Sequence, residues 1–157
     1  MDQKQPGQSS QQPLRQTHVV SCFLLRTDMD QPRMLIVRRS QRVGSYHARW
    51  AGISGFLETA VTPDEQAYTE IREETGLQGK QVRLLKRGVV IEHEDASIGR
   101  HWYIHPFLFE VLAPDAITLD WEATEMCWIN PSELQHYETV PKLEEAYMSA
   151  VNGEIIE

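Results

Sequence analysis

The sequence predicts an α+β protein, an α/β/α sandwich in which a mixed β-sheet lies between helices. Three observations predict it. The chain has 157 residues, of which 41% are hydrophobic, so it can bury the core of one domain. Short strand-like runs recur along the chain, whereas helical patterns appear in the middle and at the carboxyl end. Strands and helices do not follow a regular βαβ alternation.

The amino-terminal segment differs in composition from the rest of the chain. Residues 1–16 hold six glutamines, two prolines and few apolar side chains. Such a segment cannot bury enough apolar surface to offset the entropy lost on ordering. We therefore expect a disordered polar tail over residues 1–16 and a single domain over residues 17–157.

Charge and cysteine content narrow the range of partners. The formal net charge is -8 and the pI is about 5.2, which argues against broad binding of nucleic acid or anionic membranes. A small anionic substrate still fits if a cation or local arginines offset this charge. Two cysteines are too few for a disulfide framework. Without an apolar run of about 20 residues or a secretory signal pattern, we expect a cytoplasmic protein.

The first elements form a hairpin and a short strand. Strand patterns cover Thr17–Arg26 and Met34–Arg38, and a turn-forming segment, residues 27–32, separates them. A loop rich in Arg, Ser and Gly then leads to the apolar run Trp50–Phe56. Small residues in this run would let the backbone approach a ligand.

The clearest helix follows this strand. Thr62 fits the N-cap position, Pro63 fits the first helical position, and Glu65 completes a capping box. Gly76 provides the C-terminal stop. We therefore predict about thirteen helical residues between Thr62 and Gly76.

The carboxyl half should contain further strands and then helices. Strands are expected over Gln81–Glu92, His101–Leu112, Ile117–Asp120 and Met126–Ile129. A helical turn is expected at Pro131–Leu134. A second helix should follow Pro141, with one apolar face made of Leu143, Ala146, Tyr147 and Ala150.

Three carboxylates converge on the predicted first helix. At 100° per residue, Glu70, Glu73 and Glu74 fall within about a third of its circumference. Like charges so spaced repel one another, so the cluster needs compensation. Mg²⁺ or Mn²⁺ would supply it, because these ions prefer oxygen ligands and bridge carboxylates to phosphates. The alternative is a solvated helix face neutralised by Arg72.

The segment around these glutamates resembles a known motif. Gly55–Leu77 is similar to the 23-residue Nudix box, and the spacing from Gly55 to Gly76 matches without a gap. Two positions differ, because Val61 stands where the family usually has Glu and Thr69 where it usually has Arg. The resemblance extends over roughly residues 17–151.

The resemblance implies a fold, a reaction and a set of metal ligands. Nudix enzymes cleave a diphosphate linked to another group, with metal ions and an attacking water. By resemblance, Glu70, Glu73 and Glu74 bind the metal. In the family, the side chains at positions 61 and 69 can pair and hold the first of these glutamates. The metal site is therefore expected to survive better than the rate of turnover.

Further site residues are expected on the same grounds. Several family members carry a carboxylate in a late loop that contacts metal or water, and Glu122 matches that position. It is our candidate for the general base and for a fourth metal ligand, with Glu125, Glu92 and Glu94 as competitors. Ser54 replaces a common Gly whose backbone carbonyl can bind the metal.

Substrate-binding candidates lie in and beside the loop before the motif. Three arginines could bind a phosphate or could only keep this loop solvated, namely Arg38, Arg39 and Arg42. Trp50 could stack on a base. Tyr46 and Trp102 could do the same, and packing in the core is the default for all three aromatic residues.

The sequence therefore predicts a Mg²⁺- or Mn²⁺-dependent hydrolase of a nucleoside diphosphate linked to another group. Three segments, His105–Phe109, Leu119–Glu122 and Tyr137–Pro141, resemble Nudix domains that elsewhere precede a sugar-phosphate isomerase, which favours ADP-ribose or a related ribose diphosphate. The alternatives are a binding module without turnover, suggested by Val61 and Thr69, and a scaffold. A homodimer is frequent in the family, and the resemblance allows one here.

Overall fold

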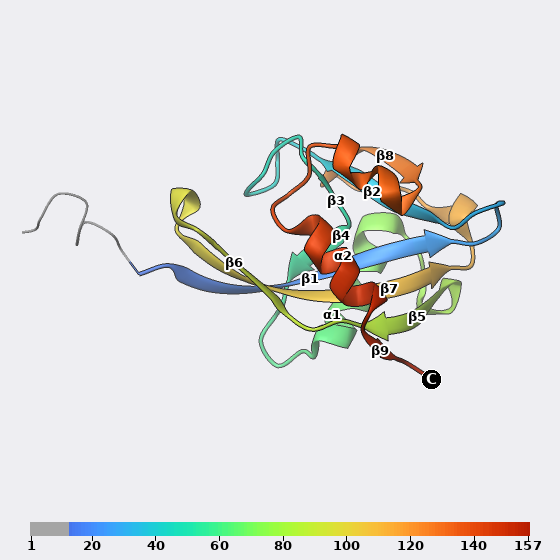
Figure 1. Ribbon diagram of the computed structural model, residues 1–157, viewed down its shortest axis with the longest axis horizontal. Helices are drawn as coiled ribbons and strands as arrows, with labels where there is room; N and C mark the ends of the chain where they lie inside the picture. The colour runs from blue at the N-terminus through green and yellow to red at the C-terminus, as the bar shows by residue number, and fades with distance from the viewer. Residues whose placement is uncertain (1–12) are drawn as a thin grey trace, which may run out of the picture.

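One mixed β-sheet with helices on both faces forms the protein (Figure 1), in a computed structural model that describes residues 13–157. Most of the predicted tail, residues 1–12, lies outside the described residues. The first strand begins at Arg15, so the last two residues of the segment predicted as a tail belong to the sheet. None of the described helices is long and apolar enough to cross a membrane.

The elements have the following bounds. The strands are β1 (Arg15–Arg26), β2 (Arg33–Arg39), β3 (Trp50–Ala51), β4 (Ile53–Phe56), β5 (Val82–Arg87), β6 (Ile91–Asp95), β7 (Arg100–Val111), β8 (Ala123–Ile129) and β9 (Glu154–Ile155). The helices are α1 (Pro63–Thr75) and α2 (Leu143–Val151), with short 3-10 turns η1 (Gly79–Gln81), η2 (Ala96–Ile98), η3 (Pro114–Ala116) and η4 (Pro131–His136).

A long parallel pair stands at the centre of the sheet. β1 and β7 run side by side from Arg15 opposite Arg100 to Leu25 opposite Glu110. The other pairings are antiparallel, including β1 with β4 and β2 with β8. The predicted mixed sheet is therefore confirmed. β6 and the adjoining parts of β1 and β7 extend beyond the helices as an arm (Figure 1).

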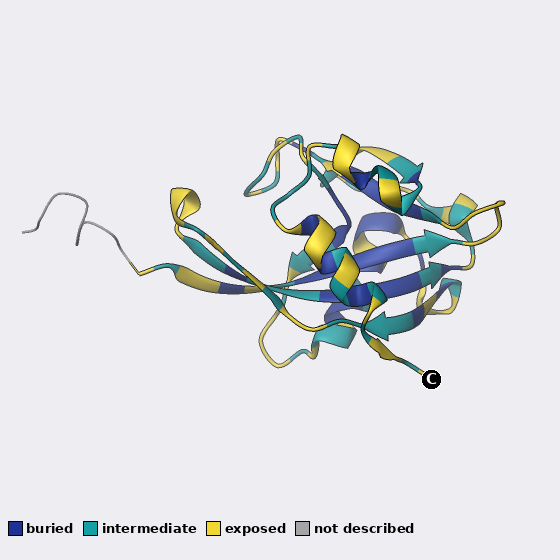
Figure 2. Ribbon diagram, in the orientation of Figure 1, coloured by how far each residue is buried: buried dark blue, intermediate teal, exposed yellow. Residues whose placement is uncertain are grey.

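Alternation along β1 divides the core between the two faces of the sheet. Val20 and Cys22 pack in one buried cluster with Ile71 of α1. Phe23 points to the other face and packs with Ala146 of α2. The central strands are accordingly buried between the two helical layers (Figure 2). Side chains in a strand alternate between faces, so one strand serves both layers of the predicted sandwich.

Helix α1 has the predicted bounds and ends. The Thr62 hydroxyl accepts a hydrogen bond from the Glu65 amide at 3.2 Å, which is one half of the predicted capping box. Gly76 adopts a left-handed conformation with φ of 76°, and its amide donates to the Arg72 carbonyl at 2.9 Å. Local sequence therefore sets both ends of the helix that carries the carboxylates.

The predicted strand over Gln81–Glu92 was wrong in its length. It forms two strands, β5 and β6, which are separated at residues 88–90. A Cβ on Gly88 would lie 2.6 Å from the Ser149 backbone of α2. The chain therefore leaves the β5 path where α2 packs closely against it, which local composition does not reveal.

The predicted strand over Ile117–Asp120 was also wrong. This segment runs along the carboxyl end of α1 and pairs with no strand in the part of the chain that the structure describes. The Thr118 amide donates to the Thr75 carbonyl at 2.9 Å, and the Asp120 amide donates to the Glu74 carbonyl at 3.3 Å. Helix-end carbonyls need donors, and this segment supplies them. It thereby ties the following loop to the helix.

Replacing the α1 cap should weaken the fold. We expect Thr62→Ala to lower the free energy of unfolding by about 1 kcal/mol, because the Glu65 amide loses its acceptor. Urea unfolding measures this change. Thr59→Ala, in the exposed loop before the helix, is the control and should change stability by less than about 0.5 kcal/mol. Equal stability of the two variants would contradict the capping role.

Candidate functional site

Three carboxylates meet beside α1. Glu70, Glu74 and Glu122 each offer an oxygen, and these oxygens lie within 4.8 Å of one another. Glu70 and Glu74 are one helical turn apart and share a buried face of α1. Glu122 comes from the loop before β8. The structure therefore brings together two of the three predicted helix carboxylates, Glu70 and Glu74, and the predicted late-loop carboxylate.

The loop that carries Glu122 is held at both sides. The Glu122 amide donates to the Asp120 carboxylate at 3.0 Å, and the Asp120 amide donates to the Glu74 carbonyl. On the other side, the Glu122 carbonyl accepts a hydrogen bond from the Ser40 amide at 2.9 Å. These bonds fix Glu122 between α1 and the end of β2.

Burial makes this cluster electrostatically unfavourable when its groups are ionised. Glu74 is only 6% exposed, and burial raises its pKa well above the usual value, with added repulsion from Glu122 and Glu70. Burial also raises the pKa of Glu70. For Glu122, burial and then Asp120 and Glu70 raise the pKa to about 7. In the absence of a cation, burial and mutual repulsion therefore raise the pKa of all three groups above the usual value for glutamate.

The cluster fits a divalent cation. Oε2 of Glu74 is buried and has no hydrogen-bond partner among the described residues. A buried carboxylate oxygen without a partner is costly, and a cation would complete it. Three carboxylates from two segments form a hard-oxygen donor set of the kind that Mg²⁺ and Mn²⁺ prefer.

Glu73 occupies a different position from its two neighbours. It is exposed and stands outside the group of three. It nevertheless lines an acidic cleft of about 400 Å³, which is also lined by Glu58, Glu70, Asp120 and Glu122. Asp120 and Glu58 were not among the predicted site residues. Asp120 reaches this cleft because its loop runs along the end of α1.

Arg39 is the predicted arginine that faces the carboxylates. Its guanidinium Nε donates to the Ser45 carbonyl at 2.9 Å, which holds the side chain in the loop after β2. Burial lowers its pKa, whereas the charges of Glu74 and Glu122 act in the opposite direction. Arg39 is thus a half-buried cation between the acidic cluster and a second cavity.

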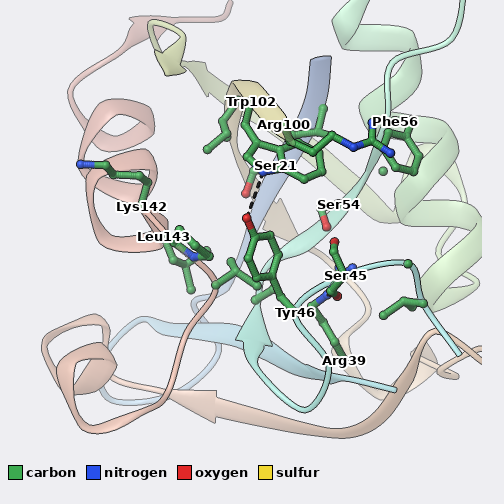
Figure 3. Close-up of a pocket in the computed structure, with 18 of the residues that line it drawn as sticks. Ser21, Arg39, Ser45, Tyr46, Ser54, Phe56, Arg100, Trp102, Lys142 and Leu143 are labelled. Carbon is green, nitrogen blue, oxygen red and sulfur yellow. Dashed lines mark hydrogen bonds between the residues drawn. The ribbon is translucent and has the colours of Figure 1, made fainter. Parts of the chain in front are cut away.

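That second cavity, of about 360 Å³, adjoins the acidic cleft (Figure 3). Gly55, Phe56, Trp121 and Glu122 line both hollows. The lining includes the cationic and aromatic side chains of Arg39, Arg42, Tyr46, Phe56, Arg100, Trp102, Trp121 and Lys142, together with aliphatic side chains such as Val19, Ile98 and Leu143. An aromatic and cationic hollow thus opens directly beside a cluster of carboxylates.

Tyr46 and Trp102 both line this cavity. Trp102 is also buried, as the sequence favoured, whereas Tyr46 is half-buried. The Tyr46 hydroxyl donates to Asp95 at 2.7 Å. It also accepts a hydrogen bond from Trp102 Nε1 at 3.0 Å (Figure 3). Phe56 and Arg100 were missed as candidates. Arg100 lies 6.0 Å from the centre of the Phe56 ring and 5.6 Å from that of Trp102. The arm of β6 and β7 therefore forms one wall.

The remaining predicted residues are divided between the cavity and its surroundings. Arg42 lines the cavity and lies 5.2 Å from the centre of the Trp121 ring. Ser54 also lines it, from the β4 strand. Arg38 instead pairs with Glu125 at 3.0 Å, outside the described lining. Trp50 packs edge-on against Tyr137 in the α2-side core.

The competing carboxylates lie elsewhere. Glu92 and Glu94 both pair with His101, at 2.9 Å and 3.5 Å, on the projecting arm. Glu125 pairs with Arg38. Among these three and Glu122, Glu122 is the one that lines the acidic cleft.

Comparison with known proteins identifies the family of the chain. The family model of the NUDIX domain matches residues 15–149. The chain therefore belongs to the NUDIX domain family, as the resemblance of Gly55–Leu77 predicted, and is a Nudix-type hydrolase.

Solved structures share the fold at low sequence identity. A Nudix hydrolase from M. smegmatis, RenU, is 15% identical with a TM-score of 0.71, covering 91% of this chain and 92% of that one. A C. elegans Ap4A hydrolase in a binary complex is 13% identical with a TM-score of 0.72, covering 85% and 93%. The E. coli dihydroneopterin triphosphate pyrophosphohydrolase is 16% identical with a TM-score of 0.71, covering 87% and 96%. The predicted α+β sandwich is confirmed.

A side chain at Gly55 should disturb the carboxylates. A Cβ there would overlap the Glu70 carboxylate, so this group would have to move. We expect Gly55→Ala to weaken Mn²⁺ binding about tenfold, measured by titration calorimetry. The control is Gly79→Ala, because a Cβ at that position meets nothing within 4 Å. Equal Mn²⁺ affinity in both variants would refute the close packing of Gly55 on Glu70.

The raised pKa of Glu122 predicts how stability depends on pH without metal. The folded pKa is about 7, whereas the ordinary value is 4.5. The folded state therefore binds more protons in this range, and stability falls as pH rises from 4.5 through about 7. Melting temperatures in EDTA should show this decline. Glu122→Gln should make it shallower, and an unchanged slope would show that Glu122 does not titrate in this way.

Proposed function

We propose that the chain is a Mg²⁺- or Mn²⁺-dependent hydrolase that cleaves a nucleoside diphosphate linked to another group, such as ADP-ribose or a related ribose diphosphate. One observation supports this most directly. The buried cluster of Glu70, Glu74 and Glu122 opens beside a cavity lined by aromatic rings and cations. A diphosphate linked to a ring-containing group could place its phosphates beside the carboxylate cluster and its ring in the cavity.

The proposed cation would be held by Glu70, Glu74 and Glu122, with Glu73 at the rim of the cleft. The Ser54 carbonyl is a further proposed ligand. When bound, a divalent cation polarises the phosphate and lowers the pKa of the attacking water.

Arg39 and Arg42 are proposed to bind the diphosphate. Both line the cavity that adjoins the acidic cleft, and a guanidinium can hold two phosphate oxygens at once. Two further residues that were predicted to bind substrate, Arg38 and Trp50, lie outside the lining of the cavity. Arg38 pairs with Glu125, and Trp50 packs against Tyr137 in the core. Phe56 and Trp102 offer aromatic surface for the remaining part of the substrate.

Glu122 is the proposed general base. It lines the acidic cleft, where a carboxylate oxygen can accept a proton from an attacking water. Water oxygen attacks phosphorus, its proton passes to the Glu122 carboxylate, and the P–O bond of the diphosphate breaks. The leaving phosphate carries away the bonding electrons. Two phosphorylated products result.

The second candidate is a ligand-binding module without turnover. Val61 and Thr69 favour it, because neither can form the ion pair that the family resemblance associates with these positions. Such a module would bind cation and nucleotide but release no product.

The setting of the protein also remains a proposal. We infer a small phosphorylated substrate, rather than nucleic acid or membrane, from the net charge of -8. A cytoplasmic location and a homodimer complete this proposal.

Product release from a panel of compounds tests the function. The panel contains ADP-ribose, other nucleoside diphosphate sugars and phosphoribosyl pyrophosphate, with Mg²⁺ or Mn²⁺. We expect turnover of at least one compound. Glu73→Gln and Glu74→Gln should each lower the turnover more than about 100-fold. That factor is the most that loss of a residue supporting a metal ligand typically costs.

The control is Glu65→Gln, which removes one negative charge from an exposed position of the same helix. It should retain normal turnover. If no compound is cleaved but Mn²⁺ and nucleotide bind together, the hydrolase proposal fails and the binding module replaces it.

A further inference from the structure

Gln66 connects the loop before α1 to the first carboxylate of the cluster. Its side chain is only 1% exposed, although it is polar. Oε1 accepts a hydrogen bond from the Glu58 amide at 3.1 Å, and Nε2 donates to Oε1 of Glu70 at 3.0 Å. One side chain thus contacts both the loop and a proposed metal ligand.

These two bonds fix the orientation of the amide. A backbone N–H is always a donor, so the Gln66 oxygen must face Glu58. The Gln66 nitrogen must then face Glu70, one helical turn further along α1. Rotation of the amide by half a turn would break both bonds. Glu70 therefore always receives a donor from this side.

Two neighbouring residues cannot hold the Glu70 carboxylate. Val61 and Thr69 carry no charge and cannot form an ion pair that would hold Glu70. The Val61 amide does close the turn onto the Glu58 carbonyl, at 3.4 Å. The loop thus presents the Glu58 amide toward the helix, where Gln66 accepts from it.

We propose that Gln66 is the positioning residue that holds the Glu70 carboxylate for cation binding in this chain, in place of an ion pair between positions 61 and 69. This inference rests on the proposed function, because it assumes that Glu70 binds a cation. Gln66 itself touches neither cation nor substrate. It acts through Glu70 and through the loop that it fixes.

A neutral amide has a different effect from a cation at this place. It donates one hydrogen bond to Glu70 but leaves the negative charge of the cluster intact. A guanidinium would offset part of that charge and compete with the metal. The Gln66 amide therefore fixes the position of Glu70 without reducing the negative charge that attracts a divalent cation.

The alternative is that Gln66 only stabilises the fold. A buried polar group with both hydrogen bonds made needs no further role. The two roles differ in one measurement, the affinity for Mn²⁺ in the absence of substrate. Loss of a positioning residue weakens metal binding, whereas loss of stability alone does not, provided that the protein stays folded.

The test compares Gln66→Met with wild type in the full chain. Met has a similar length and no amide, so both hydrogen bonds are lost. We expect Mn²⁺ binding, followed by electron paramagnetic resonance without substrate, to weaken about 10- to 100-fold. Urea unfolding confirms that the variant is folded at the temperature of the titration. If it is not, Gln66→Ala is measured in the same way.

Thr62→Ala is the matched control. It weakens the same helix at its cap, but it leaves the contacts of Gln66 in place. It should bind Mn²⁺ as tightly as wild type. If Gln66→Met also binds as tightly, Gln66 is structural only, and this inference is overturned while the proposed function stands. If wild type itself fails to bind Mn²⁺, the proposed function fails first.

Discussion

The site depends on keeping three carboxylates together, of which two are buried and the third is half-buried. Glu70 and Glu74 are buried on α1, and Glu122 is brought to them by a loop. Such an arrangement is unstable unless each charge is protonated, hydrogen-bonded or paired. The protein uses all three means: raised pKa values, the Gln66 amide on Glu70, and the half-buried cation Arg39 nearby. Oε2 of Glu74 remains without a hydrogen-bond partner among residues 13–157, so a metal ion would contribute most there.

The sheet supplies the rigid base for this cluster. β1 pairs along most of its length with β7 and also with β4, so the strand before α1 is fixed to the centre of the core. Gly55 in β4 leaves room for the Glu70 carboxylate against the strand. The segment after η3 then supplies donors to the last carbonyls of α1 and delivers Glu122. Backbone hydrogen bonds, rather than side-chain pairing, thus set the distance between the helix and its third carboxylate.

Local signals account for what the sequence could predict. Thr62 and Gly76 define α1 within a few residues, and helical spacing alone places Glu70 and Glu74 on one face. The loop along Ile117–Asp120 and the break at Gly88 depend on contacts with α1 and α2, which composition does not contain. The aromatic cavity was missed for the same reason. Its walls come from the loop after β2, from β4 and from the β6–β7 arm, and only the folded sheet brings these together.

The distribution of charge explains how an acidic chain can accept an anionic ligand. The net charge is -8, yet Arg39, Arg42, Arg100 and Lys142 all line one cavity. Arg39 lies at its border with the carboxylates, so the sign of the local charge changes across a single side chain. A diphosphate placed there would meet cations on one side and carboxylates on the other. Its phosphates could bind against the carboxylates only if a metal ion bridged the two negatively charged groups. The acidic cluster and the cationic cavity are therefore best understood as two parts of one site.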